Sequence, residues 1–568
     1  MPYKEQPMNR LRKNMSARGF LAGALLTGTA FFFIRATTTD PYFEISKNLD
    51  IYSNLFKELN SFYVDPIEPG KLVKTGVDAM LQELDPYTNF ITEADIEEYE
   101  FMTTGKYGGI GANMQRKGDE IYIADVYENS PAHIAGLHPG DMVESIDDQP
   151  LKGKSVEDLG SLLKGSPGTQ LKMRVKDAYT QTVTEKQITR GEIEISSVPY
   201  AGLVGPQNNI AYVRLTQFTQ SCGAQVRDAF DSLKKVQPTL KGLVLDLRNN
   251  PGGLLDEAVN TCNIFLDKGQ PVVSTRYKIP EMDKEYKTML PAWDKTLPLT
   301  VLVNKSSASA SEIVAGTIQD LDRGVIIGER SYGKGLVQVT RPLGFKSHLK
   351  LTVARYYTPS GRCIQALDYT HRNADGSVNT FADSLRKTFK TKAGRTVLSG
   401  GGVSPDLAVK DDPMSLVAAT LYSKNYIFDY ATEFAAKHSS IPDPTKFSLT
   451  EAEFGQFTKW VENKDFSYKT ETETELDSLK SIAVKEKYYE SAKAEFEALK
   501  SKLSHDKKQD LLKHKDQVRH VLESEIASRY YYTRGRMAQT MQYDKELEKA
   551  IAIINAPAEY SSLLKPGK

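Results

Sequence analysis

The sequence predicts a multidomain α+β protein with a mixed-sheet α/β core and helical N- and C-terminal parts. Two segments, residues 242–266 and 299–321, each begin with an apolar run of strand length, pass through a turn and continue with apolar residues at helical spacing. Such repeated strand–helix units favour a mixed or parallel sheet covered by helices. A chain of 568 residues, 40% of them hydrophobic, is long enough to form several domains with their own cores.

The composition gives no indication of nucleic-acid or zinc binding. Basic and acidic residues number 73 each, so the formal net charge is zero. The three cysteines, Cys222, Cys262 and Cys363, lie far apart and without CxxC spacing, which indicates neither a disulfide framework nor a zinc site. We expect them to be buried small hydrophobic residues.

Residues 1–40 are expected to be a cytoplasmic basic stub followed by an apolar targeting segment. An apolar run from Gly19 to Ile34 follows basic residues at positions 4, 10, 12, 13 and 18. Positive charge before such a run predicts export of the chain that follows it. An uncleaved signal anchor and a cleaved signal peptide both remain open, and the lack of a convincing Ala-x-Ala site favours the anchor.

The regions flanking the predicted core are expected to be mainly helical. Apolar residues at three- and four-residue steps predict a helical region over residues 41–104, with breaks at the prolines of 63–66 and 84–88. The Leu-Asp-Pro-Tyr-Thr sequence at 84–88 is interpreted as a helix stop without a catalytic role. Residues 277–293 are expected to be a charged surface loop, and residues 411–568 a charged helical C-terminal domain.

A serine-rich turn connects a predicted strand to a predicted helix. The apolar run Leu299–Val303 is followed by small polar residues, and either Ser307 or Ser309 can cap the next helix. Glu312 completes a capping-box pattern with Ser309. A serine in this position is either a cap and nothing more, or a nucleophile beside free helix N–H groups that stabilise an oxyanion.

A lysine between two glycines follows the next predicted strand, residues 325–328. Lys334 is flanked by Gly333 and Gly335 and precedes an apolar run. On a strand, Lys334 and Gln338 would point to the same face, so the Gln338 amide is expected to hold the Lys334 amine in place.

The two motifs together resemble the catalytic segment of the C-terminal processing, or tail-specific, serine peptidases. The similarity covers Ser-Ala-Ser-Ala-Ser-Glu around Ser309 and Gly-Lys-Gly-Leu-Val-Gln around Lys334, without gaps. The resemblance implies that Ser309 is the nucleophile, Lys334 the general base and Gln338 the residue that orients the lysine. The chemistry agrees, because a serine hydroxyl needs a base and a lysine serves as one only when burial lowers its pKa.

A second resemblance indicates a PDZ domain over residues 105–190. Its glycine-rich loop consists of Tyr107, Gly108, Gly109, Ile110 and Gly111, and Ser-Pro-Ala and Pro-Gly-Asp elements follow at the distances typical of the domain. Consecutive N–H groups in such a loop can bind the terminal carboxylate of a peptide. Relatives often have an arginine late in this domain where this chain has Lys164, which keeps the charge but lacks the bidentate guanidinium. We therefore leave open whether the PDZ domain activates, inhibits or tethers.

The family resemblance spans roughly residues 42–410 and implies a protease core over residues 191–410 with a crotonase-like spiral. It also implies that a Gly-Gly turn lends an N–H group to the oxyanion hole. We assign this role to Gly253, with Gly252 as the alternative, together with Ala310. A turn that needs glycine only for its backbone angles is the other interpretation. Asp246 and Arg248 are expected to hold this turn.

The sequence thus predicts an exported serine endopeptidase that binds protein C-termini and needs no metal or organic cofactor. Protein or peptide substrates with unstructured C-termini are the expected partners, with an adaptor or activator and a homo-oligomer left open. The resemblance implies the bacterial cell envelope, on the periplasmic side of the inner membrane. The alternative is a catalytically silent PDZ scaffold. A Ser–His–Asp hydrolase is disfavoured, because none of the eight histidines, His348 included, has a triad-like setting.

Overall fold

A computed structural model describes residues 41–373, 375–410, 413–503 and 507–566. The chain forms two compact units that meet in sequence after Glu83. The predicted targeting segment, Gly19–Ile34, lies outside the described residues. Within the described ranges, no helix is both long and apolar enough to cross a membrane.

The first unit is a pair of helices, α2 (Pro41–Phe62) and α3 (Pro69–Gln82). They pack closely where Gly76 faces Tyr52, because a Cβ on Gly76 would lie 2.8 Å from the tyrosine hydroxyl. Several large apolar side chains of α2, including Phe43, Leu49 and Leu55, are exposed. The chain breaks at residues 63–66 as predicted, but the region predicted to be helical, residues 41–104, also contains a short strand at residues 89–91.

The centre of the second unit is a six-stranded sheet with the order β10-β11-β12-β15-β16-β23. β10 runs antiparallel to β11, and the other neighbours are parallel. All residues of β12 and β15 are buried, as expected for parallel strands covered on both faces. The bounds are β10 (Tyr200–Val204), β11 (Ile210–Arg214), β12 (Gly242–Asp246), β15 (Leu299–Val303), β16 (Val325–Gly328) and β23 (Leu407–Ala408).

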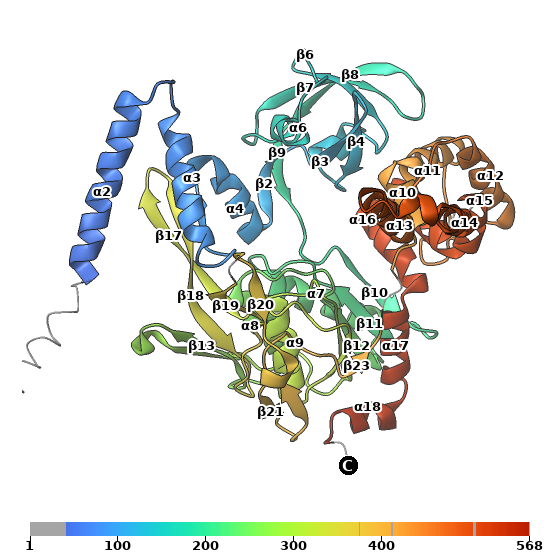
Figure 1. Cartoon of the computed structure of the whole chain (residues 1–568). Helices are drawn as coiled ribbons and strands as arrows, with labels where there is room; N and C mark the ends of the chain where they lie inside the picture. The colour runs from blue at the N-terminus through green and yellow to red at the C-terminus, as the bar shows by residue number, and fades with distance from the viewer. Residues whose placement is uncertain (1–40, 374, 411–412, 504–506, 567–568) are drawn as a thin grey trace, which may run out of the picture. The chain divides into compact units, whose positions relative to one another are not determined.

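Helices cover both faces of this sheet (Figure 1). On one face, α7 (Cys222–Val236), α8 (Leu255–Phe265) and α9 (Ala310–Asp320) pack in one apolar cluster with strand residues such as Leu245. On the other, α17 (Lys545–Ile554) and α18 (Pro557–Leu563) pack with residues such as Val244. The last two helices therefore complete the protease core, although they belong to the segment expected to be a separate C-terminal domain.

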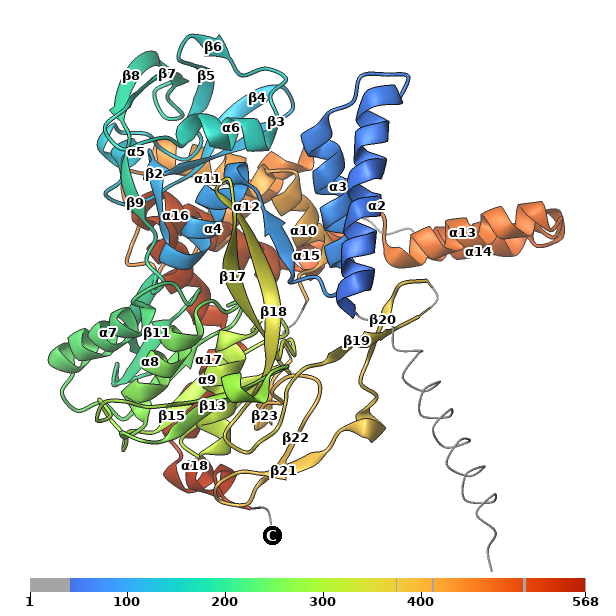
Figure 2. The ribbon, with the colours of Figure 1, turned by 90° about the vertical axis from the view of Figure 1, so that its left-hand side faces the viewer.

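The second unit contains another sheet, and the segment that carries Lys334 leads into one of its strands, β17. The order of this sheet is β1-β18-β13-β14, and β17 pairs along nearly the whole of β18 in a long antiparallel hairpin (Figure 2). The bounds are β1 (Asn89–Ile91), β13 (Pro271–Tyr277), β14 (Lys284–Lys287), β17 (Leu336–Gly344) and β18 (Ser347–Tyr357). Two small hairpins follow, β19 (Leu367–Arg372) with β20 (Val378–Thr380), and β21 (Thr388–Lys390) with β22 (Thr396–Leu398).

The prediction of a surface loop at residues 277–293 is wrong in part. β14 pairs antiparallel with β13 over residues 284–287. Three of its four side chains are exposed and charged, and Tyr286 alone packs against the core. Main-chain pairing rather than side-chain burial holds this edge strand, so its composition looked like that of a loop.

The PDZ domain has its own core, with Ile123, Leu159 and Met173 buried inside it. Its main sheet contains β3 (Ala112–Lys117), β4 (Glu120–Val126), β5 (Met142–Ile146), β6 (Gln149–Pro150), β7 (Gln170–Lys176) and β8 (Val183–Thr189). β2 (Lys106–Gly109) pairs with β9 (Gly191–Glu194), and the helices are α5 (Pro131–Ile134) and α6 (Val156–Leu163).

The C-terminal part is helical, as predicted, and buries residues such as Ala431, Phe457 and Leu522 in a separate cluster. Its helices are α10 (Leu416–Ser423), α11 (Tyr426–Lys437), α12 (Glu451–Glu462), α13 (Glu471–Lys485), α14 (Lys493–Leu503), α15 (Lys507–Lys513) and α16 (Lys515–Thr540). Non-helical backbone angles at Tyr531 and Tyr532 divide α16 into two helical stretches.

Candidate active site

A cleft of about 630 Å³ brings together the residues predicted for catalysis. Its lining includes Ser309 and Ala310 from the start of α9, Gly252 and Gly253 from the turn after β12, Lys334 from the segment leading into β17, and Gln338 from β17 itself. Side chains of α4 (Ile96–Thr104), including Tyr99 and Met102, also line it. The tertiary structure thus places four sequence segments around one space.

Ser309 occupies the N-cap position of α9 with an unusual backbone conformation. Its φ is 54° and its ψ is −113°, a combination that is sparsely populated for residues other than glycine. The Glu312 carboxylate accepts a hydrogen bond from the Ser309 N–H at 2.9 Å, as the capping-box pattern predicts. Strained backbone of this kind is common at functional sites, where the surrounding structure holds it in place.

Glu312 is completely buried and joins the serine segment to the lysine segment. Besides Ser309, its carboxylate accepts hydrogen bonds from the Gly333 N–H at 2.7 Å, the Lys334 N–H at 2.9 Å and the Ser331 hydroxyl at 2.5 Å. Burial raises the pKa of Glu312 to about 7 against the opposing effect of these donors. The sequence indicated only a helix-capping role for this residue.

The main-chain N–H groups of Gly253 and Ala310, which line the cleft, have no acceptor among the described residues. The Gly252 N–H is already donated to the Asn250 side chain at 2.9 Å. Gly252 has a φ of 101°, and a Cβ on it would lie 2.8 Å from the Cβ of Ser309. This geometry favours Gly253 over Gly252 as the amide available to an oxyanion, while Gly252 allows the turn to approach the serine.

Asn250 connects the glycine turn to the serine segment, which the sequence did not predict. Its buried side chain donates to the Leu215 carbonyl at 2.8 Å as well as accepting from Gly252. Its carbonyl oxygen accepts from the Ala308 N–H at 3.0 Å and from the Ser311 hydroxyl at 2.9 Å. These bonds hold the two candidate oxyanion segments in a common arrangement.

Lys334 has the properties required of a basic amine. Burial and the nearby positive charge of Lys350 lower the pKa of Lys334 to about 8. Its Nζ lies 4.4 Å from the centre of the Tyr87 ring. In the described part of the chain, the amine has no hydrogen-bond partner. The side chain is therefore held by packing and by the face of an aromatic ring.

The hydrogen bond expected between Gln338 and Lys334 is not present, and this expectation is corrected. The Gln338 amide instead donates to the Thr352 hydroxyl at 3.1 Å. Strand β17 begins only at Leu336, and its register with β18 shifts between Val337 and Gln338. The prediction assumed the alternation of a strand from Lys334 to Gln338, but Lys334 precedes β17, so the two side chains need not share a face.

The turn at residues 85–88, assigned no catalytic role from the sequence, lies beside the lysine. Tyr87 supplies the ring under the Lys334 amine. The Asp85 carboxylate accepts from the Thr352 hydroxyl at 3.2 Å, and Thr352 in turn accepts from Gln338. Asp85 and Tyr87 are more than 200 residues away from Lys334 in the chain, so no local pattern indicated the contact.

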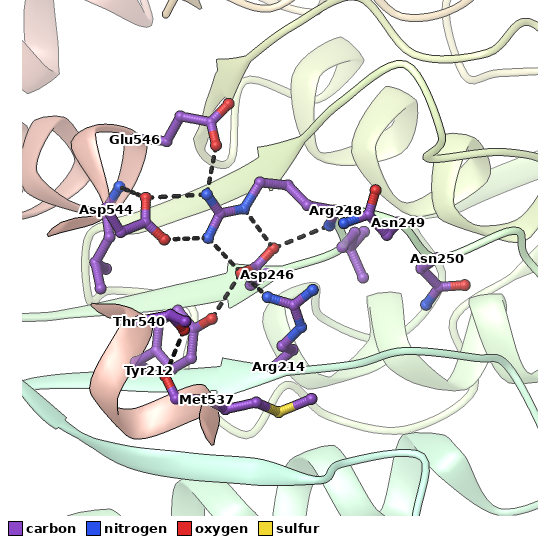
Figure 3. Close-up of polar contacts among 12 residues, drawn as sticks. Tyr212, Arg214, Asp246, Arg248, Asn249, Asn250, Met537, Thr540, Asp544 and Glu546 are labelled. Atoms are coloured by element: carbon purple, nitrogen blue, oxygen red, sulfur yellow. Dashed lines mark hydrogen bonds and ion pairs between the residues drawn. The ribbon is translucent and has the colours of Figure 1, made fainter. Parts of the chain in front are cut away.

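Buried charges hold the turn that carries the glycines (Figure 3). Arg248 bonds to Asp246 at 2.6 Å, to Asp544 at 2.5 Å and to Glu546. Although burial opposes it, the guanidinium groups of Arg248 and Arg214 keep the pKa of Asp246 well below its usual value. Asp246 and Arg248 thus hold the turn as predicted. Asp544, which caps α17, and Glu546 on α17 are partners that the sequence did not reveal.

The predicted PDZ loop follows β2. Tyr107, Gly108 and Gly109 lie on this strand, and Ile110 and Gly111 come directly after it. The Ile110 side chain is completely buried, so only its main chain is available to a peptide. The Gly111 N–H group has no acceptor among the described residues, and Gly109 forms an isolated antiparallel bridge with Lys164. The Lys164 amine lies 6.0 Å from the centre of the Tyr107 ring, at the same loop.

Other reactive side chains lie outside the cleft. Over the described ranges, one group of side chains is spaced for metal binding: His138, Asp141 and Asp177, whose ligand atoms lie within 4.8 Å of one another in the PDZ domain. Both carboxylates also accept hydrogen bonds from backbone N–H groups, those of His138 and Ala178 for Asp141 and those of Tyr179 and Thr180 for Asp177. His348 lies on β18 but does not line the cleft. Cys222 and Cys262 are buried, as predicted, and Cys363 is partly buried.

Sequence comparisons define the class of protein to which this cleft belongs. Residues 209–370 match peptidase family S41, residues 122–177 match the PDZ domain, and residues 417–554 match the C-terminal helical domain described for a probable PDZ-protease. The protein is therefore a PDZ-containing serine peptidase with a helical C-terminal part.

Curated relatives identify the family more closely. A carboxy-terminal-processing protease of Bartonella bacilliformis is 33% identical over 353 residues, which are 62% of this chain and 80% of the relative. A probable CtpA-like serine protease of Staphylococcus aureus is 33% identical over 350 residues, 61% of this chain and 68% of the relative. The chain belongs to peptidase family S41, among the carboxy-terminal-processing serine proteases.

Solved structures of similar proteins include the photosystem II D1 C-terminal processing protease. It is 27% identical, with a TM-score of 0.33 and coverage of 64% of this chain and 93% of that chain. A putative S41 protease from Bacteroides fragilis is 16% identical, with a TM-score of 0.38 and coverage of 66% and 90%.

Proposed function

We propose that the protein is an exported serine endopeptidase that binds protein C-termini through its PDZ domain and cleaves by a Ser309–Lys334 acyl-enzyme mechanism. One observation carries the proposal. A single cleft contains a serine in a strained helix-start conformation, a partly buried lysine and two main-chain N–H groups without acceptors, those of Gly253 and Ala310. Acyl transfer requires these three components: a nucleophile, a base and an oxyanion site.

In this mechanism, the Ser309 hydroxyl attacks the carbonyl carbon of the scissile peptide bond while Lys334 takes its proton. The negative charge that develops on the carbonyl oxygen is held by the Gly253 and Ala310 N–H groups. The C–N bond breaks as the lysine ammonium returns the proton to the leaving amine. Water then hydrolyses the ester on Ser309, with Lys334 again accepting the proton.

The lowered pKa of Lys334 supports a role as a base near neutral pH. At a pKa of about 8, roughly a tenth of the lysine is neutral at pH 7, compared with less than a thousandth at the usual value of about 10.4. The rate constant for acylation is therefore expected to rise about tenfold per pH unit until the lysine is neutral.

The proposed recognition of C-termini is supported by the PDZ loop. The Gly111 N–H group is without an acceptor among the described residues and follows the short strand β2, so it is placed to bind the carboxylate of a peptide. Export to the bacterial cell envelope, with the N-terminal segment as anchor or signal, is part of the proposal and is supported by the basic stub before Gly19–Ile34.

The mechanism is tested by cleavage of an unfolded model protein with the chain from residue 41 onward, from pH 6 to 10. Ser309→Ala and Lys334→Ala are each expected to abolish cleavage, and the rate of the unsubstituted enzyme is expected to rise toward a plateau above pH 8. Lys235→Met, which changes an exposed lysine on α7, serves as the control. Cleavage by the Lys334→Ala variant would rule out the lysine base, and an inactive enzyme that still binds C-terminal peptides would favour the scaffold.

The C-terminal recognition is tested on the substrate side. The same unfolded substrate is prepared with a free C-terminal carboxylate and with an amidated C-terminus. Amidation is expected to raise KM at least tenfold and to leave kcat nearly unchanged, because it removes the anion that the loop N–H groups bind. Equal KM values for the two substrates would contradict recognition through the carboxylate.

A further inference from the structure

We propose that Tyr87 is a positioning residue for Lys334, whose ring stabilises the ammonium that forms when the lysine takes the Ser309 proton. The inference rests on the proposed role of Lys334 as the base. It concerns the turn of residues 85–88, which precedes the PDZ domain in sequence and lies far from both catalytic motifs in the chain.

The geometry places the ring directly at the amine. The distance of 4.4 Å from the Lys334 Nζ to the centre of the Tyr87 ring is within the range of a cation–π interaction. The amine makes no hydrogen bond in the described part of the chain, and the Gln338 amide is already donated to Thr352. Together with packing, the aromatic face therefore positions the lysine amine in this structure.

The Tyr87 ring is fixed by hydrogen bonds to its hydroxyl and within the turn that carries it. The Tyr87 hydroxyl accepts a hydrogen bond from the Tyr369 hydroxyl at 3.3 Å, and the two rings meet edge to face at 6.0 Å. The Tyr87 and Thr88 N–H groups both donate to the Asp85 carboxylate, at 2.8 and 2.9 Å. Because Tyr87 is held both at its main chain and at its hydroxyl, its ring keeps a defined orientation.

The same turn also reaches the residue expected to orient the lysine. The Thr352 N–H donates to the Thr88 hydroxyl at 3.2 Å, and the Thr352 hydroxyl donates to Asp85. Because Gln338 donates to this Thr352 hydroxyl, the turn contacts Lys334 directly and Gln338 through one intermediate. It is thus part of the surroundings of the base rather than a simple helix stop.

The charged groups around Lys334 and the Tyr87 ring together determine the pKa of the amine, so the contribution of the ring can be measured. The titratable groups that face the amine from the neighbouring elements are Lys350 on β18, Asp85 and Tyr87 in the turn, and Glu312 on α9. Lys350 disfavours the ammonium, whereas Asp85, Glu312 and the ring favour it. Removing the ring alone is expected to make the ammonium less stable and hence the amine a weaker base.

The test compares variants that remove the ring with variants that remove only the hydroxyl. Tyr87→Leu is expected to lower kcat at the pH plateau at least tenfold with little change in KM. It is also expected to move the acid limb of the pH profile about half a unit to lower pH, as a lost cation–π contact requires. In Tyr87→Phe and Tyr369→Phe, which lose the phenol–phenol hydrogen bond but keep the ring under the lysine, the limb is expected to stay in place.

A second measurement separates this inference from the mechanism itself. In the Ser309→Ala protein, the Lys334 amine is titrated by NMR after ¹³C-methylation, with and without Tyr87→Leu and with Lys334→Ala to assign the signal. A titration midpoint that falls in Tyr87→Leu supports the positioning role whether or not the protein cleaves.

An unmoved midpoint and an unmoved acid limb in Tyr87→Leu would overturn the proposal, as would equal shifts in Tyr87→Leu and Tyr87→Phe. If thermal melting shows that Tyr87→Leu does not fold, Tyr87→Met replaces it, because its flexible side chain fills the space without an aromatic face. Activity in Lys334→Ala would instead refute the lysine mechanism and leave the midpoint measurement to decide the contact between the ring and the amine.

Discussion

The two sides of the catalytic cleft are held by different kinds of interaction. On the serine side, Arg248, Asn250 and Glu312 are buried or nearly buried, and each makes several hydrogen bonds. On the lysine side, the Lys334 amine rests on an aromatic ring without a hydrogen bond in the described structure. The oxyanion site must be rigid before the substrate arrives, whereas the base must gain and lose a proton in each turnover.

Glu312 is one of the residues that connect the two sides, and Tyr356, whose hydroxyl contacts the Ser309 and Lys334 carbonyls, is another. The Glu312 carboxylate binds the main chain at Ser309 and at Lys334, but not the lysine amine. The backbone of the lysine segment is thus as firmly held as that of the serine segment, and the contrast applies only to the lysine side chain. Four substitutions distinguish the two kinds of interaction.

The largest effect is expected from Glu312→Gln. An amide in this position presents an NH₂ group to N–H donors, so at least one buried bond is lost and one donor is left unpaired. The free energy of unfolding is expected to fall by about 3 kcal/mol and kcat by at least 100-fold. Urea denaturation and steady-state kinetics measure the two effects.

The control is Glu257→Gln on α8, a nearly buried carboxylate that accepts the Gly223 N–H at 2.9 Å and does not line the cleft. It is expected to lower stability without changing kcat. If Glu312→Gln has the kcat of the unsubstituted enzyme, Glu312 does not hold the catalytic segments.

Arg248→Met is expected to destabilise the protein by about 3 kcal/mol, because it leaves the carboxylates of Asp246, Asp544 and Glu546 without their cation. The turn that carries Gly253 is then expected to loosen, with a tenfold or larger loss of kcat. Arg395→Met, which breaks pairs with Asp322 and Asp406 away from the cleft, is the matched control. Comparable stability loss with unchanged kcat in the control would assign the kinetic effect to the turn.

Lys334→Met is expected to change stability in the opposite direction. The pKa of Lys334 is about 8 in the folded protein and near its usual value of about 10.4 in the unfolded chain. Below pH 8, both states carry the charge and the folded state bears the cost of burying it. The variant should therefore be more stable at pH 7, by about 2 kcal/mol.

This advantage has a defined pH dependence. Between pH 8 and 10.4, the unfolded chain binds more protons than the folded protein, so the stability of the unsubstituted protein rises relative to that of the variant and the difference closes. Urea unfolding at pH 7, 9 and 10.5 measures it, with the exposed Lys235→Met as the control. A variant that is less stable at pH 7 would show that the lysine is paired rather than merely buried.

The smallest effect is expected from Thr352→Val, which removes the hydroxyl between Gln338 and Asp85. Loss of these two bonds is expected to cost about 1 kcal/mol of stability and to change kcat less than tenfold. Thr300→Val, at a fully buried position on β15 outside the cleft, controls for the swap of a hydroxyl for a methyl group. Equal kcat values in the two variants would show that Thr352 has no influence on the base.

Much of the fold could be predicted from the sequence because its signals are local. The strands at 242–246 and 299–303 and the helices that follow them were predicted from runs of apolar residues alone. β14 was not, because its charged side chains are typical of a loop and only its pairing with β13 makes it a strand. The packing of α17 on the protease sheet was also unpredictable, since an amphipathic helix does not specify the surface that it covers.

The candidate site likewise contains residues that could be predicted from the sequence and residues that could not. Ser309, Lys334 and Glu312 carry short-range signals, namely a helix cap, a lysine between glycines and a three-residue spacing. The expected Gln338 contact failed because it assumed strand alternation from Lys334 onward, whereas β17 begins only at Leu336. Asn250, Tyr87 and Asp85 were missed because their partners are distant in the chain.

By itself, the sequence determined the strand–helix units, the serine and lysine motifs and the balance of charges, because each depends on residues that are close in the chain. The tertiary structure decided that Gly253 rather than Gly252 has an uncommitted N–H, that α17 holds Arg248, and that Tyr87 lies under the Lys334 amine. These features depend on which distant surfaces pack together and which hydrogen bonds are already satisfied, and only the folded chain specifies both.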